Sequence, residues 1–270
     1  MNPFLKKYVV FALIAAATLT ATAAMAATGV ANTKHNLAIG GPSNVFSAAP
    51  ASGLTQVCIF CHTPHNAGQN KLLWNKANNS NINFRLYTSS ATLTNTVKKF
   101  SSLPAGSPSL LCLGCHDGKT AMNILHNTTN GVDPVAAGAI GYPAGSRLIP
   151  KQNGQAVPVV MPDPVTDMFT GQTAPAMNIG GPNGSAGDNL TDDHPIGFSY
   201  SNAYTDKGVG KGLHDWNGMD SKVRFFGASK RVECSTCHDP HIDPVAYPNQ
   251  KPFLVKSNVG SALCLTCHDK

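Results

Sequence analysis

The hydrophobic and polar positions of this 270-residue chain form one long apolar run near the start and only short patterns after it. Residues 8–17 are almost wholly apolar. Beyond them, few segments keep the roughly 3.6-residue hydrophobic period of an amphipathic helix. Short helices are predicted at 120–126 and within 92–100, and no extensive sheet is predicted. The pattern therefore predicts mostly irregular coil with short helices and little sheet.

The apolar run belongs to an export signal over residues 1–26. Lys6 and Lys7 precede it, and Ala24, Met25 and Ala26 form a small-residue cleavage site. The alternative is an uncleaved membrane anchor, but ten apolar residues are too few to span a bilayer comfortably. No later stretch is apolar for long enough to do so. We therefore expect an exported mature chain that starts at Ala27 and has no membrane span.

Composition limits how such a chain can build a core. It has 25 Gly, 19 Pro and only 13% charged residues, so side chains alone would seldom form a large packed interior. Without Lys6 and Lys7, 18 basic residues face 14 acidic ones, a net charge of +4. That scattered excess does not suggest a nucleic-acid partner. Another component must therefore supply core volume.

All eight cysteines fall into four Cys-x-x-Cys pairs, and a histidine follows each pair directly. This is the attachment sequence of haem c, in which both thiols bond to the porphyrin and the histidine binds the iron. Disulfides or structural zinc are the alternatives, but neither explains the four histidines. The predicted attachment residues are Cys58, Cys61, Cys112, Cys115, Cys234, Cys237, Cys264 and Cys267, and the predicted proximal ligands are His62, His116, His238 and His268.

The chain contains an internal repeat that supplies candidate distal ligands. CIFCHTPH resembles CSTCHDPH, and LCLGCHD resembles LCLTCHD. His62 and His65 lie three residues apart and cannot occupy opposite faces of one porphyrin, so His65 would bind a different haem. The same holds for His238 and His241, and each half is thereby expected to bring two haems into close contact.

Six histidines lie outside the proximal positions, and the repeat separates them. Four have counterparts in both halves and match the four irons that need a sixth ligand: His35, His65, His194 and His241. His126 and His214 are then surplus. Methionine is the alternative ligand, but none of Met122, Met161, Met168, Met177 and Met219 recurs in the two halves. Four bis-His haems are the prediction.

The repeat also divides the mature chain. Residues 27–126 form a first dihaem half and residues 194–270 a second. Between them, residues 127–193 are rich in Gly, Pro and Asn, and we expect a partly ordered wrapping segment there. Aromatic side chains are expected to shield the porphyrins, namely Trp74, Phe84, Tyr87, Phe198, Tyr200, Phe225 and Phe226.

The segments KHNL, CIFCHTPHN, LLWN, LCLGCHDGK, DDHPIGF, CSTCHDPH and GSALCLTCHD together resemble the doubled Cys-x-x-Cys-His cytochromes of metal-respiring bacteria. Within them the chain looks most like outer-surface tetrahaem cytochromes that polymerise into extracellular nanowires. The resemblance implies a multihaem cytochrome c fold organised around four stacked haems. It also implies a homopolymer in which His35, on an N-terminal arm, ligates a haem of the neighbouring subunit.

Four capped irons leave no position for a substrate, so the function predicted is electron transfer and not enzymatic catalysis. The filament would pass respiratory electrons to other redox proteins or extracellular acceptors. A soluble periplasmic shuttle is the alternative. A multihaem reductase of a small nitrogen compound would need an open iron, and a membrane quinol dehydrogenase would need a retained anchor.

Overall fold

The computed structural model describes the greater part of both predicted halves and little of the segment between them. The described residues are 29–38, 40–42, 46–48, 55–64, 67, 73–75, 84–87, 91–117, 148–150, 179, 189–191, 193–208 and 210–269. The expected signal, the expected helix at 120–126, His65, His126 and most of 127–193 lie outside them. Among the described residues, no helix is long and apolar enough to cross a membrane.

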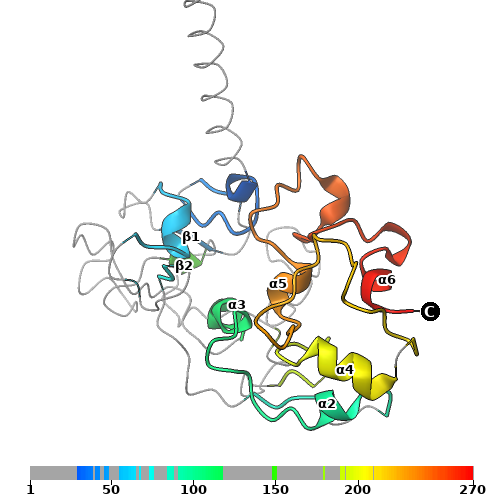
Figure 1. Ribbon diagram of the computed structural model, residues 1–270. Helices are drawn as coiled ribbons and strands as arrows, with labels where there is room; N and C mark the ends of the chain where they lie inside the picture. Colours follow the sequence, from blue (N-terminus) through cyan, green and yellow to red (C-terminus); the bar gives the residue numbers. More distant parts are fainter. Residues whose placement is uncertain are drawn as a thin grey trace, which may run out of the picture.

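Every Cys-x-x-Cys pair lies on a short helical turn. The pairs occupy the 3₁₀ turn η2 (Cys58–Phe60) with the residue after it, and helices α3 (Ser109–His116), α5 (Cys234–Cys237) and α6 (Cys264–Cys267). Residues three apart on a helix share a face, so both thiols of each pair point to one side. Helix α5 lies between α3 and α6 (Figure 1).

Helices α2 (Asn95–Lys98) and α4 (Tyr200–Lys207) pack side by side and join the two halves (Figure 1). Each begins at a hydroxyl cap, because Thr94 accepts a hydrogen bond from Val97 N and Ser199 accepts one from Asn202 N. Asp206 on α4 also accepts from the backbone N–H of Thr96, at 2.7 Å. Helix α2 confirms the helix predicted within 92–100.

One small sheet is present in the described part of the chain. Strand β1 (Phe46–Ala48) pairs antiparallel with β2 (Leu148–Pro150), with Ser47 opposite Ile149. The second half also contains the 3₁₀ turns η4 (Pro248–Gln250) and η5 (Val259–Ser261). For the described residues, the prediction of mostly irregular chain with short helices and little sheet is confirmed.

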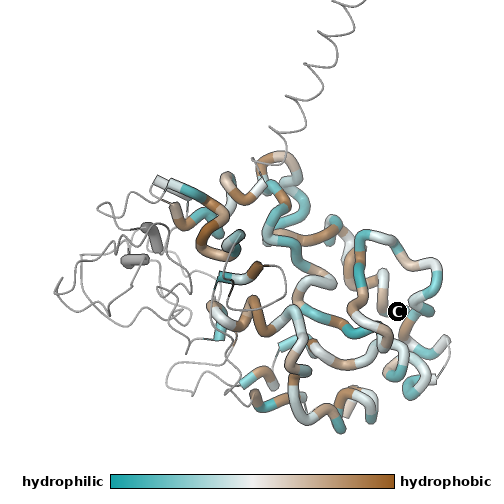
Figure 2. Tube along the Cα trace, turned by 60° about the vertical axis from the view of Figure 1, so that its left-hand side comes forward, coloured by the Kyte–Doolittle hydropathy of each residue, from teal (hydrophilic) through white to brown (hydrophobic). Residues whose placement is uncertain are grey.

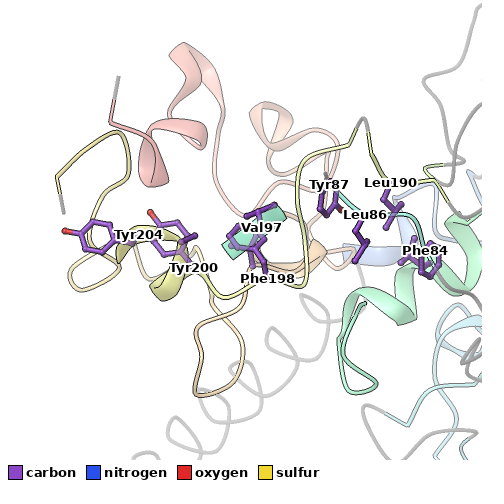
Figure 3. Packing of buried hydrophobic residues seen from close by; sticks show 11 residues of the cluster. Phe84, Leu86, Tyr87, Val97, Leu190, Phe198, Tyr200 and Tyr204 are labelled. Carbon is purple, nitrogen blue, oxygen red and sulfur yellow. The ribbon is translucent and has the colours of Figure 1, made fainter. Parts of the chain in front are cut away.

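The main apolar core is shared by both halves. Hydrophobic residues occur in short stretches along the described part of the chain (Figure 2). Their side chains nevertheless form one elongated row (Figure 3). The row is made of Phe84, Leu86, Tyr87, Val97, Leu113, Leu190, Phe198, Tyr200, Ala203, Tyr204 and Val232. Because the row takes residues from both halves, burial of apolar surface holds the halves together.

Candidate functional site

The cysteine pairs are available for attachment. All eight cysteines lie in the described part of the chain, and all are thiols, not disulfides. The Cys112 thiol donates a hydrogen bond to the Cys234 sulfur, which raises the pKa of Cys112 and lowers that of Cys234. The attachment points of the second and third motifs are therefore in contact, although 122 positions separate them in the sequence.

The structure brings three motif histidines into pairs with three of the predicted distal histidines. The His35 and His116 ring centroids are 6.0 Å apart. Those of His62 and His241 are 6.2 Å apart. Those of His194 and His268 are 6.4 Å apart. Each pair thus combines one proximal histidine with one candidate sixth ligand.

These distances fit a metal ion held between two imidazoles. Imidazole nitrogens bind first-row metals such as zinc at about 2.0–2.1 Å, so two rings on opposite sides of one ion have centroids roughly 6 Å apart. Two protein ligands are too few for structural zinc, whereas haem iron needs only its axial positions filled. Among the described residues, no three His, Cys, Asp or Glu side chains group to hold a metal by themselves. The donor set fits haem iron.

His35 has surroundings that suit a metal ligand. Its ring is partly buried and lies 4.7 Å from that of Phe253. The buried Nδ1 has no hydrogen-bond partner among the described residues, which ordinarily costs about 1–3 kcal/mol. Burial, followed by the nearby His116, lowers the pKa of His35 to about 4. The ring is therefore neutral at physiological pH, as a metal ligand must be.

The segment that carries His35 is packed against the loop after α5. Asn32 donates a hydrogen bond to Asp243 at 2.9 Å. Gly29 lies so close to His241 that a Cβ atom there would clash with the His241 carbonyl oxygen. Ligation of a haem in a neighbouring subunit by His35 would occur only in an assembly, and it stays a prediction.

His62 and His241 belong to different halves of the chain, so their pairing joins the two halves. The sequence repeat had instead predicted that close contacts between haems would form within each half. His241 follows the third motif, and His62 belongs to the first. His65 is the repeat counterpart of His241 and lies outside the described residues. Of the surplus histidines, His126 also lies outside them. His214 is exposed, and its backbone N–H donates to the Cys267 carbonyl at 2.9 Å.

The ring nitrogens of three candidate ligands have partners that orient them. His238 Nδ1 lies 2.9 Å from the Pro252 carbonyl oxygen, and His194 Nδ1 lies 3.0 Å from that of Pro195. His241 Nδ1 instead lies 2.8 Å from a carboxylate oxygen of Asp239. Such contacts fix the tautomer and leave Nε2 for a metal.

A buried carboxylate joins the second motif to the third. Glu233 is fully buried and accepts hydrogen bonds from Ser107, from Ser109 at 2.6 Å and from Arg231 at 2.9 Å. Ser109 in turn accepts from Cys234 N at 2.9 Å. Glu233 also forms a capping box with Thr236 at the start of α5. The network therefore fixes α3, at its N-terminus, against α5.

Glu233 and Asp239 were not among the residues predicted from the sequence. Both adjoin a motif, Glu233 directly before Cys234 and Asp239 directly after His238. This adjacency was the available signal. Their partners Ser109 and Arg224 are distant in the sequence, so no local pattern reveals them.

Residues 227–270 match the family model described as the doubled CXXCH motif. The match covers the third and fourth motifs. No curated protein matches the chain. The matched signature is that of multihaem c-type cytochromes, and it indicates covalently bound haem c and a role in electron transfer.

Proposed function

We propose that the protein is a tetrahaem electron carrier in which every iron has two histidine ligands, and that it acts as a subunit of an extracellular filament. The observation that carries the first part is the set of three histidine pairs at 6.0–6.4 Å. Each pair contains the histidine of a different Cys-x-x-Cys-His motif. By the symmetry of the repeat with the pair of His62 and His241, His65 would ligate the iron of His238 as the fourth pair.

The chain's own residues then have distinct tasks. The eight thiols would anchor the porphyrins and the paired imidazoles would ligate the irons, which would leave no iron position for a substrate. Haem c bound in this way supplies a one-electron couple of ferric and ferrous iron. The contact between Cys112 and Cys234 brings two attachment points together. Close spacing of the haems favours electron transfer between them.

The first test uses the native protein. Haem quantified against protein should give four haems per chain, and electron paramagnetic resonance of the oxidised protein should show only low-spin iron, because each iron has two imidazole ligands. A count of two, or a sizeable high-spin fraction, would contradict the proposal. The high-spin result would favour a reductase with an open iron.

The filament part rests on the resemblance to nanowire-forming cytochromes and on the expected export signal. Electron microscopy of the native secreted protein should show uniform filaments of one repeating subunit. Monodisperse monomers outside the cell would overturn the filament and leave a soluble carrier. Recovery of the protein only from the periplasm would favour the shuttle.

A further inference from the structure

The two repeats of Cys-x-x-Cys-His-x-Pro-His differ at one position that touches a candidate ligand. Asp239 occupies this position in the second repeat, and Thr63 occupies it in the first. Thr63 is buried and uncharged. The difference places a carboxylate beside His241 and no carboxylate at the matching position of the first half.

Asp239 is held in a fixed orientation toward His241. Its Oδ1 atom accepts hydrogen bonds from His241 Nδ1 at 2.8 Å and from the His241 backbone N–H at 3.0 Å. Its Oδ2 atom lies 3.2 Å from Arg224 Nη2. Asp239 thus lies between a histidine N–H donor and a guanidinium, and an aspartate with such partners is a carboxylate at neutral pH.

We propose that Asp239 is a positioning residue that strengthens His241 as an axial ligand and lowers the reduction potential of the haem attached at Cys58 and Cys61. This inference rests on the proposed function, and specifically on the pairing of His62 with His241. An imidazole that donates its Nδ1 proton to a carboxylate becomes a more basic ligand. A more basic ligand favours ferric over ferrous iron.

The neighbouring motif histidine has a weaker partner. His238 Nδ1 faces the neutral Pro252 carbonyl, at 2.9 Å. The haem attached at Cys234 and Cys237 therefore lacks this anionic support on its proximal side. On this assignment the first-motif haem is the harder of the two to reduce, and electrons reside preferentially on the third-motif haem.

The test is Asp239→Asn in the holoprotein, which keeps the side-chain shape and removes the charge. Spectroelectrochemical titration should show one of the four haems shifted to higher potential, by about tenfold in its reduction equilibrium constant, or 59 mV for one electron. His241→Met exchanges the ligand that Asp239 contacts and should also raise the potential of the same iron. In the double variant, Asp239→Asn should add little to that shift, because no imidazole is left to donate to residue 239.

Asp243→Asn is the matched control. It removes the same charge two residues after His241, but Asp243 accepts from Asn32 and Val245 N, not from a histidine. The reduction equilibrium constants of all four haems should stay within about twofold of wild type. Equal shifts in the potentials of all haems in both variants would mean that Asp239 acts only as a distant charge. That result would overturn the inference. So would an Asp239→Asn protein with four unchanged potentials.

Arg224→Leu is a second variant, for which a potential change of the opposite sign is expected. It leaves the Asp239 carboxylate without its cation, so the same haem should shift to lower potential. If Asp239→Asn fails to fold, an unchanged potential in Arg224→Leu overturns the inference. Sizeable high-spin iron in the wild-type protein would instead show that the proposed ligation had failed, before any variant was compared.

Discussion

Replacing Glu233 with leucine is expected to lower the free energy of unfolding by on the order of 3 kcal/mol, because it removes one partner of a buried charge network. The carboxylate accepts from Ser107, Ser109 and Arg231, and the leucine would leave these donors unsatisfied. It would also remove half of the capping box at α5. Chemical denaturation followed by circular dichroism measures the loss.

Glu233→Gln is the control for shape. It retains hydrogen-bonding atoms and loses only the charge, so its destabilisation should be clearly smaller than that of Glu233→Leu. Haem quantification of both variants separates lost stability from failed attachment at Cys234. A leucine variant as stable as wild type would show that the network does not stabilise the contact between α3 and α5.

Replacing His35 with alanine is expected to convert one of four haems, about one quarter of the iron, from low-spin to high-spin, since one iron loses its sixth ligand. The affected haem should be that of His116, whose ring lies 6.0 Å from His35. Electron paramagnetic resonance of the oxidised protein gives the fraction. His214→Ala removes an exposed histidine and should leave the spectrum wholly low-spin.

The same spectrum distinguishes ligation within the chain from ligation between subunits. If His35 serves its own chain, dissociated wild-type monomers remain wholly low-spin. If it serves a neighbour, monomers show about one quarter high-spin iron, which disappears on assembly. The packing of Asn32 and Gly29 near His241 supports the first outcome. A high-spin monomer would overturn it.

The irregular fold followed from the sequence because Gly, Pro and weak periodicity act locally. Helix α2 lies within the predicted range for the same reason, since a helix of four residues depends on its immediate neighbours in the sequence. The shared core was not predicted. It brings Leu113 together with Val232, and such contacts depend on the path of the whole chain.

In the candidate site, too, the local features were predictable and the tertiary contacts were not. The motifs and the spare histidines were visible because spacing and repetition are properties of the sequence. Their pairing was not, because His62 meets His241 only through tertiary packing. The orienting groups were hidden for that reason too, as Asp239 meets Arg224 and Glu233 meets Ser109 across long stretches of chain.

The pairing of His62 with His241 has a consequence for biogenesis. A chain exported from its N-terminus presents the first motif long before His241 emerges. On the proposed ligation, the first haem to be attached waits with an open axial position until nearly the whole polypeptide has been delivered. Maturation intermediates and truncated products would then bind small ligands such as carbon monoxide, and completion of the chain would close that reactivity.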